Sequence, residues 1–228
     1  MRRWIAIGDS LKILRKAGLQ VRAVIDVGVQ YDTEELRVGF PDVPHILFEP
    51  IQEYHDTIRS RYSDVDYQLF RWAVARAPGE LILENVRADD AGVVSHVVNA
   101  EVDSAGTRRV RSVSLDAFLE EHPVPAPYLL KIDVDGSESD IMRGGVAAMR
   151  NCSCLIVETT LPMLSECCYL ASLSGLRLWD IVDFNFYHGN LYQVDLVFVH
   201  ESQVQLLPVL DPYEAINRGL DRSAWFAH

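Results

Sequence analysis

Short apolar runs that are rich in β-branched residues alternate with helical segments along the chain, and this alternation is the strongest constraint on its fold. Five such runs occupy residues 21–28, 45–50, 67–74, 128–134 and 154–159. Strands that alternate with helices predict βαβ units and a parallel sheet covered on both faces. Residues 176–184 and 194–200 are joined by too few residues for a crossover helix, so we expect them to form an antiparallel hairpin.

The length of 228 residues suits one α/β domain and is short for two. Residues 1–20 predict an amphipathic N-terminal helix, and residues 201–228 form a C-terminal tail of unassigned role. Turn signals within residues 75–112 indicate an insertion or additional edge strands. We therefore expect a single domain over residues 1–228.

The charge balance limits the classes of partner. The chain has 33 acidic and 21 basic residues and a formal net charge of −12, which argues against nucleic acid and against an anionic membrane surface. No run approaches the roughly 18 apolar residues that span a bilayer, so a soluble, cytoplasmic protein is expected. A homo-oligomer is compatible with the sequence.

The four cysteines do not have the spacing of a zinc site. Cys152 and Cys154 are followed by the adjacent pair Cys167 and Cys168, whereas zinc knuckles usually use two C-x-x-C pairs. We expect buried free thiols.

Carboxylates follow four of the predicted strands. The strand ends carry Asp26, Glu49, Asp133 and Glu158. In an open parallel sheet, ligands bind beyond the carboxyl ends of the strands. The sequence therefore predicts an acidic ligand site at this edge of the sheet.

The pair formed by Asp26-x-Gly28 and Glu49 suits a nucleoside. A glycine turn lets a cofactor approach the backbone, and an acidic residue about 20 positions later can accept both ribose hydroxyls. Alternatively, Asp26 caps the next helix and Glu49 is a solvated strand end. The residues after Gly28 include Asp32, Glu34 and Glu35. This negative charge disfavours a pyrophosphate and favours a positively charged sulfonium cofactor.

In several of its segments the chain resembles the FkbM family of S-adenosylmethionine-dependent methyltransferases. The similar segments are VIDVG (24–28), FEP (48–50), SLDAFL (114–119), LKIDVDGSE (130–138) and LIVE (155–158). The resemblance covers about residues 23–160. It implies a Rossmann-like class I methyltransferase fold, with a seven-stranded, mostly parallel sheet, a reversed last strand and helices on both faces.

The resemblance also implies roles for individual residues. Asp26 and Gly28 would line the methionine and ribose region, Glu49 would hold the ribose hydroxyls, and Trp72-Ala73 would flank the adenine. Trp72 could equally be a core residue.

Two residues of the cofactor loop depart from the family pattern. Gln30 stands in place of an asparagine and remains a cofactor-binding candidate, and Asp32 stands in place of the second glycine. Asp32 lacks the freedom of glycine at positive φ and is expected to repel the cofactor's carboxylate.

FkbM-like enzymes are associated with O-methylation of hydroxyls on sugars, glycans and natural products. A hydroxyl is a weak nucleophile and needs a general base or a metal. Asp133 is the first candidate for the catalytic base, Glu158 the second, and His188 a third from an aromatic loop. Asp133 and Glu158, with Asp195 if the last strand lies close by, could also bind Mg²⁺ or Mn²⁺.

Two alternatives remain open from the sequence. Asp133-x-Asp135 satisfies the D-x-D motif of metal-dependent glycosyltransferases, although that interpretation leaves the DVG and FEP segments unexplained. The second alternative is a degenerate homologue that binds the cofactor but does not catalyse a reaction.

Overall fold

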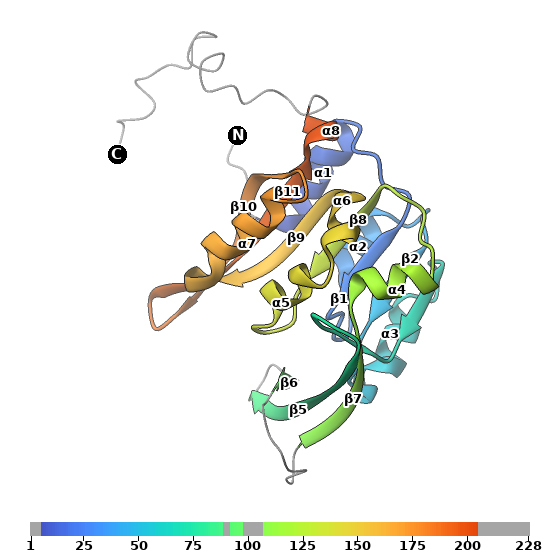
Figure 1. Cartoon of the computed structure of the whole chain (residues 1–228), viewed down its shortest axis with the longest axis vertical. Coiled ribbons are helices and arrows are strands. Elements are labelled where there is room, and N and C mark those ends of the chain that lie inside the picture. Colours follow the sequence, from blue (N-terminus) through green and yellow to red (C-terminus); the bar gives the residue numbers. More distant parts are fainter. Residues whose placement is uncertain (1–5, 89–91, 98–106, 205–228) are drawn as a thin grey trace.

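The computed structural model describes residues 6–88, 92–97 and 107–204, which form a larger and a smaller sheet with helices packed around the larger one (Figure 1). Within these residues the larger sheet has seven strands in the order β10-β11-β9-β8-β1-β2-β3. The strands are β1 (Val24–Val27), β2 (His45–Phe48), β3 (Tyr67–Phe70), β8 (Tyr128–Ile132), β9 (Cys152–Thr160), β10 (Leu176–Tyr187) and β11 (Asn190–His200).

The direction of the strands confirms the predicted fold class. β3, β2, β1, β8 and β9 are parallel, whereas β11 runs antiparallel to both β9 and β10. The last strand is therefore reversed, and β10 and β11 form the expected hairpin. From β1 the chain builds outward to β3 and then returns to β8 on the other side of β1, so a topological switch point lies between β1 and β8.

Helices cover both faces of the larger sheet. One face packs against α1 (Ile7–Lys16), α2 (Glu34–Gly39) and α3 (His55–Arg61), the last preceded by the 3₁₀ helix η1 (Gln52–Tyr54). The other face packs against α4 (Leu115–Glu121), α5 (Glu138–Arg143), α6 (Val146–Arg150) and α7 (Leu164–Ser172), the last preceded by the 3₁₀ helix η3 (Leu161–Met163). The described chain ends in α8 (Glu201–Val204). Near-continuous apolar strands such as β8 are buried because both faces are covered.

The described helices include none with the length and apolar character needed to cross a bilayer. The four cysteines are free thiols, and Cys152, Cys154 and Cys167 are buried as expected; Cys168 is half-buried, so the expected burial is wrong for that residue.

The segment after β8 forms two short helices rather than one continuous helix. Gly144 and Gly145 separate α5 from α6. A Cβ on Gly144 would lie 2.5 Å from the carbonyl oxygen of Arg76, and one on Gly145 would lie 2.9 Å from Cδ1 of Leu115. The two glycines thus allow the break to pack closely against neighbouring segments.

The smaller sheet lies below the larger one in Figure 1 and has the order β4-β7-β5-β6. Its strands are β4 (Ala73–Val74), β5 (Gly79–Ala88), β6 (Gly92–Val97) and β7 (Thr107–Val113). The prediction of one strand over residues 67–74 is therefore wrong, because the run divides into β3 in one sheet and β4 in the other. Leu83 and Val110 of the smaller sheet pack against Ile51 and Ala73.

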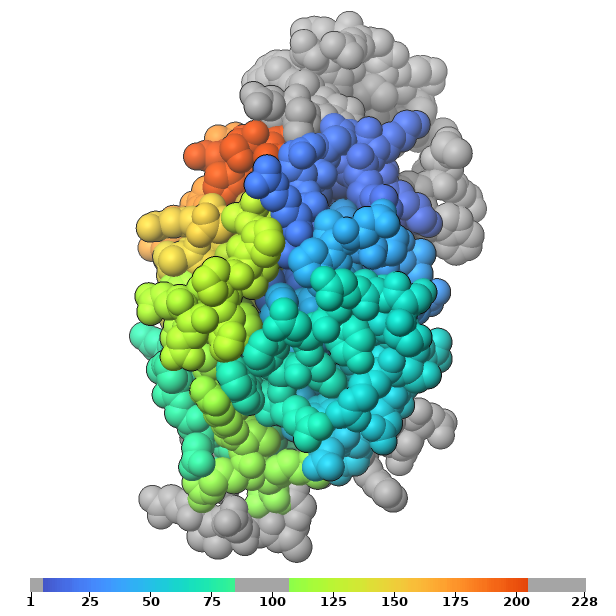
Figure 2. Space-filling model, turned by 90° about the vertical axis from the view of Figure 1, so that its right-hand side faces the viewer, coloured from blue at the N-terminus to red at the C-terminus, as the bar shows by residue number. Residues whose placement is uncertain are grey.

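Aromatic packing joins β3 to α4. On the face in Figure 2, the cyan-to-teal segment around α3 and β3 lies beside the yellow-green α4. The rings of Phe70 and Phe118 are 4.8 Å apart at this contact, and the ring of Trp72 is 5.1 Å from that of Phe70. This cluster fixes the chain at the point where it leaves the larger sheet.

Candidate functional site

A cavity of about 770 Å³ opens at the carboxyl ends of the central strands. It lies at the switch point between β1 and β8, which is where open α/β sheets bind ligands. Gly28, Glu49, Asp133 and Glu158 all line it. The expectation that polar strand ends meet at one edge therefore holds for β1, β2, β8 and β9.

Gly28 brings the loop after β1 into contact with the end of β8. Its φ is +90°, and a Cβ at this position would lie 1.7 Å from the carbonyl oxygen of Asp133. A side chain is thus excluded by both conformation and space. The backbone amide of Gly28 donates to the carbonyl of Phe48 at 3.1 Å, which also ties the loop to β2.

Glu49 is held by backbone amides on both of its oxygens. The amide of Ile51 donates to Oε1 at 2.7 Å, and the amide of Gln30 donates to Oε2 at 2.8 Å. Burial raises the pKa of Glu49 to about 7, although these two hydrogen bonds oppose the shift. Each carboxylate oxygen accepts more than one hydrogen bond, so Glu49 can still accept from two neighbouring hydroxyls.

Asp26 lies beneath the cofactor loop rather than on the cavity wall. Its side chain is fully buried, and neither oxygen has a hydrogen-bond partner at ordinary bonding distance among the described residues. Burial raises its pKa to about 6, while Lys131 and the nearby Thr33 hydroxyl favour the ionised form. Buried polar groups are seldom left unpaired, so we expect an ordered water beneath the loop to donate to this carboxylate.

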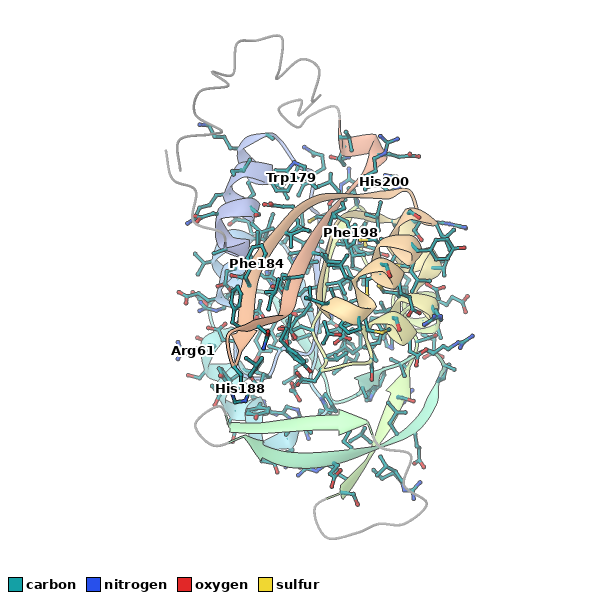
Figure 3. All side chains as sticks on the ribbon, turned by 90° about the vertical axis from the view of Figure 1, so that its left-hand side faces the viewer. Arg61, Trp179, Phe184, His188, Phe198 and His200 are labelled. Carbon is teal, nitrogen blue, oxygen red and sulfur yellow. The ribbon has the colours of Figure 1, made fainter. Side chains whose placement is uncertain are left out.

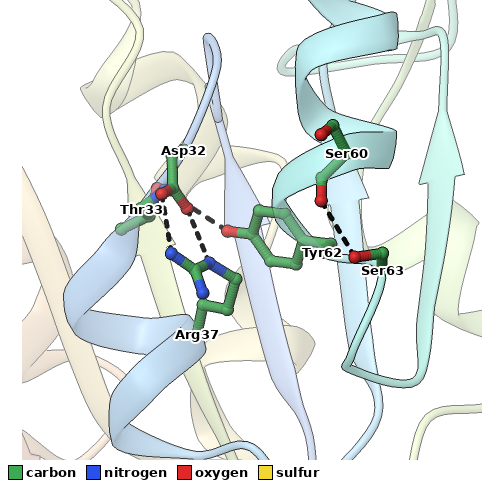
Figure 4. A network of polar contacts seen from close by, with 6 residues as sticks. All are labelled: Asp32, Thr33, Arg37, Ser60, Tyr62 and Ser63. Atoms are coloured by element: carbon green, nitrogen blue, oxygen red, sulfur yellow. Dashed lines mark hydrogen bonds and ion pairs between the residues drawn. The ribbon is translucent and has the colours of Figure 1, made fainter.

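The charge of Asp32 is paired within the protein, which reduces the expected repulsion of the cofactor's carboxylate; the repulsion itself stays a prediction. Arg37 donates from Nε to Oδ1 of Asp32 at 3.0 Å and from Nη2 to Oδ2 at 2.9 Å (Figure 4). This bidentate pair compensates the charge of Asp32. Gln30, and not Asp32, has the positive φ, at 55°. The strained position in the loop is therefore two residues earlier than expected.

Lys131 anchors a cluster of carboxyl groups. It is 7% exposed and forms an ion pair with Asp133. Burial opposes ionisation of Asp133, but the Lys131 charge and hydrogen bonds from Glu158 and Lys131 hold its pKa below the usual value. Burial and the charge of Asp133 raise the pKa of Glu158 to about 9. At neutral pH, Glu158 is therefore a protonated donor to an ionised Asp133.

Asp195 joins this cluster from the reversed strand. It stands opposite Glu158 in the β9–β11 ladder and lines the cavity. Burial raises its pKa to about 7; Lys131 opposes the shift, and Asp133 adds to it. Asp133, Glu158 and Asp195 are thus brought together, but no group of three or more His, Cys, Asp or Glu side chains in the described chain has metal-binding geometry. The Mg²⁺ or Mn²⁺ site stays a prediction, and no step below uses it.

Of the remaining predicted site residues, two line the cavity and one does not. Trp72 and Ala73 line the cavity, and the guanidinium of Arg111 lies 3.8 Å from the centre of the Trp72 ring. His188 lies in the turn of the β10–β11 hairpin, is exposed, and is not among the residues that line the cavity (Figure 3). The structure therefore does not bring His188 to the carboxyl cluster.

One wall of the cavity was predicted from the sequence only in part. We call it the acceptor end: Glu158, Asp183, Asn185, Tyr187, Gln193 and Asp195, from β9, β10 and β11. Glu158 and Asp195 were candidates from the sequence, and the other four were missed. Asp183, Asn185 and Tyr187 occur at every second position, which puts them on one face of a strand. That alternation was a usable signal. The backbone irregularities along β10 were not visible, because they depend on its pairing with β11.

The residues at the other end fit a nucleoside-bearing sulfonium cofactor. Gly28 permits close backbone approach, Glu49 can receive two hydroxyls, and Trp72 offers an aromatic wall. The unpaired carboxylate of Asp26 adds negative charge beneath them. This combination suits a cation without phosphate groups.

Comparison with known proteins gives one family match and one short sequence match. The family model described as the methyltransferase FkbM domain matches residues 28–192. Over 58 residues the chain is 31% identical to the hexuronic acid methyltransferase AglP of Haloferax volcanii. That alignment covers 25% of this chain and 24% of AglP, so the chain matches about a quarter of that relative's length.

Two solved structures are similar over most of the chain. One is a methyltransferase FkbM from Methylobacillus flagellatus KT, with a TM-score of 0.48, 16% identity, and coverage of 78% of this chain and 43% of that chain. The other is a precorrin-6y C5,15-methyltransferase from Geobacter metallireducens GS-15, with a TM-score of 0.45, 13% identity, and coverage of 82% and 85%.

Proposed function

The chain belongs to the FkbM family of methyltransferases, and we propose that it transfers the methyl group of S-adenosylmethionine to a hydroxyl of a sugar-containing acceptor, either a small molecule or a glycan. The observation that carries the proposal is the contact between Gly28 and Asp133. It joins a cofactor loop to a carboxylate in one cavity. The similarity to a hexuronic acid methyltransferase supports a sugar acceptor.

The cofactor end of the cavity would hold the nucleoside. When bound, S-adenosylmethionine supplies an electrophilic methyl group. Glu49 accepts the ribose hydroxyls on the lone pairs that Gln30 and Ile51 leave free. Trp72 would contact the adenine, and the guanidinium of Arg111 lies 3.8 Å from the centre of the Trp72 ring, which helps to hold that ring in place. Asp26 contributes negative charge from below, which favours a cationic ligand over a neutral one.

Asp133 has the role of orienting the acceptor hydroxyl. Because Lys131 keeps it ionised, it is a hydrogen-bond acceptor at neutral pH. Glu158 donates to Asp133 and limits its rotation. An oriented hydroxyl, with its proton directed at a carboxylate, satisfies the positional requirement of an in-line displacement.

Aromatic residues next to the acceptor end support a carbohydrate ligand. Tyr187 lines the cavity and is 59% exposed, and its ring centre lies 5.0 Å from that of Tyr192 in an edge-on arrangement. Phe184, labelled in Figure 3, is exposed too, but it does not line the cavity. Such rings offer apolar faces to the C–H faces of sugars while their edges stay in water.

The glycosyltransferase alternative loses its basis. Asp133-x-Asp135 lies inside the residues matched by the methyltransferase family model. The non-catalytic alternative stays a prediction, and the Arg37–Asp32 ion pair removes one reason for it, the uncompensated charge of Asp32.

Replacement of Asp133 by asparagine tests the proposal. Methyl transfer to sugar hydroxyls, followed with radiolabelled S-adenosylmethionine, should fall by about 100-fold or more. Affinity for S-adenosylhomocysteine should stay within about twofold. Asp140→Asn, at an exposed position on α5, is the matched control and should change neither quantity. Unchanged turnover in Asp133→Asn would reject the assigned role, and a wild-type protein that binds the cofactor product but methylates no sugar hydroxyl would reject the function.

A further inference from the structure

We propose that the acceptor end of the cavity recognises a sugar that carries a cationic amino group and discriminates against sugar acids. This inference rests on the proposed methyl transfer to sugars and specifies the charge class of the acceptor. It concerns recognition of the acceptor and not the atom that receives the methyl group.

The ionisable side chains on the cavity wall are mostly acidic. Among the described residues that line the cavity, Lys131 is the only basic one, and its ammonium is already paired with Asp133. The acceptor end itself contains Glu158, Asp183 and Asp195 and no basic residue. An anionic group placed there would be repelled by Asp183 and by the ionised form of Asp195, whereas a cationic group would be attracted to both and could replace the proton of Asp195.

Within the acceptor end, Asp195 is the carboxyl group with the fewest hydrogen bonds to described residues. It is 8% exposed, it lines the cavity, and no described residue donates a hydrogen bond to its carboxylate. By comparison, Asp183 accepts from the backbone amide of Ile7 at 2.9 Å, and Glu158 is bonded to Asp133. A buried polar group left unpaired is costly, and a charged donor from a ligand would satisfy it. An ammonium group supplies three such donors.

The cofactor does not account for these carboxyl groups. The nucleoside site proposed above uses β1 and β2, through Gly28 and Glu49. β9, β10 and β11 lie on the other side of β8 in the sheet order. Asp195 and Asp183 are therefore directed at whatever occupies the half of the cavity away from β2.

Tyr187 strengthens the case for a cation on a sugar ring. It lines the same wall as Asp195, and it holds an exposed ring that Tyr192 supports from the side. Aromatic faces attract ammonium groups and also contact sugar rings. One ligand that combines a sugar ring with an amino group satisfies both features.

The test uses three matched methyl glycosides, derived from glucosamine, glucose and glucuronic acid. Their binding to the full chain is measured by ligand-observed NMR titration at neutral pH, both without cofactor and with saturating S-adenosylhomocysteine. The expected order of affinity is glucosaminide, then glucoside, then glucuronide, with roughly tenfold or more between the first and the last. Equal affinities, preference for the glucuronide, or no binding of the glucosaminide would overturn the inference.

Asp195→Asn tests the residue itself. It should lower the affinity for the glucosaminide by about tenfold while leaving that for the glucoside within about twofold, because it removes charge and keeps shape. Glu166→Gln, on α7 and outside the cavity, is the control and should preserve the order. The wild-type series decides the inference even if Asp195→Asn does not fold. Binding in the expected order without any methyl transfer would count against the proposed function alone.

Discussion

Gly28 and Asp133 are in backbone contact, such that a Cβ on Gly28 would lie 1.7 Å from the Asp133 carbonyl oxygen. The two residues belong to the ends of different strands and are far apart in the sequence. Their contact sets the distance between the cofactor loop and the carboxyl cluster. Any change that separates them would disturb both halves of the proposed reaction at once.

Gly28→Ala should therefore destabilise the protein much more than an ordinary glycine replacement. Gly18 is the matched control, because its φ is +93° and nothing lies within 4 Å of its Cβ position. Gly18→Ala should cost about 1–2 kcal/mol for the left-handed backbone. Gly28→Ala adds a backbone clash and should exceed that cost by about 2 kcal/mol or more in urea unfolding. Similar costs for the two variants would show that the contact is easily relaxed.

Arg37→Gln should weaken cofactor binding by exposing the charge of Asp32. The pair is largely buried, with side-chain exposures of 14% and 10%. Loss of the guanidinium leaves a carboxylate uncompensated in the cofactor loop, and affinity for S-adenosylhomocysteine should drop by about tenfold. The double variant Arg37→Gln/Asp32→Asn should recover most of this loss in calorimetric titration.

Arg59→Gln provides the comparison for that experiment. Arg59 also pairs with an aspartate, Asp56, but on the exposed surface of α3. Its replacement should leave binding unchanged. If Arg37→Gln is folded and binds as tightly as wild type, the compensation assigned to this pair is wrong.

Stability should fall as pH rises from 7 to 8. Burial raises the pKa of Glu49 and Asp195 to about 7 and that of Glu158 to about 9. Their ordinary values are near 4, so the folded state holds more protons than the unfolded state in this window. Each such proton lowers the free energy of unfolding by about 1.4 kcal/mol per pH unit. A total decrease on the order of 1–2 kcal/mol is expected in urea titrations.

Glu158→Gln should remove a large part of this decrease, because glutamine carries no titrating proton. Asp133→Asn is expected to have a similar effect, since it removes the charge that helps to raise the pKa of Glu158. Stability that is flat or rises between pH 7 and pH 8 in the wild-type protein would contradict the proposed protonation of the cluster.

The sequence allowed accurate prediction where a property is local. Glu49, Asp133 and Glu158 follow apolar strands, and strand polarity alone places them at one edge of the sheet. Ser114 begins the SLDAFL segment, and serine is a common N-cap residue; its Oγ accepts from the amide of Ala117 at 3.3 Å at the start of α4. Both conclusions need only a few neighbouring residues.

The failures came from contacts between distant segments. The division of residues 67–74 between two sheets depends on the pairing of β4 with the distant strand β7. The charge of Asp32 could not be judged without knowing that the next helix directs Arg37 back toward it. His188 was favoured by its aromatic surroundings, but it lies in the turn of the β10–β11 hairpin and does not line the cavity, although its neighbour Tyr187 does. None of these follows from residue type or spacing.

The most direct test of the central claim is calorimetric titration of S-adenosylhomocysteine into the wild type, Glu49→Gln and Glu53→Gln. In Glu49→Gln the side-chain amide would face one of the two backbone amides that now donate to the carboxylate, so affinity should fall by about tenfold or more. Glu53 is exposed and pairs with Arg108, and Glu53→Gln should bind like the wild type. We predict one binding site per chain in the wild type, about tenfold or more weaker binding in Glu49→Gln, and wild-type affinity in Glu53→Gln. Absence of binding to the wild type, or equal affinity in Glu49→Gln, would contradict the assignment of this cavity as a methyltransferase cofactor site.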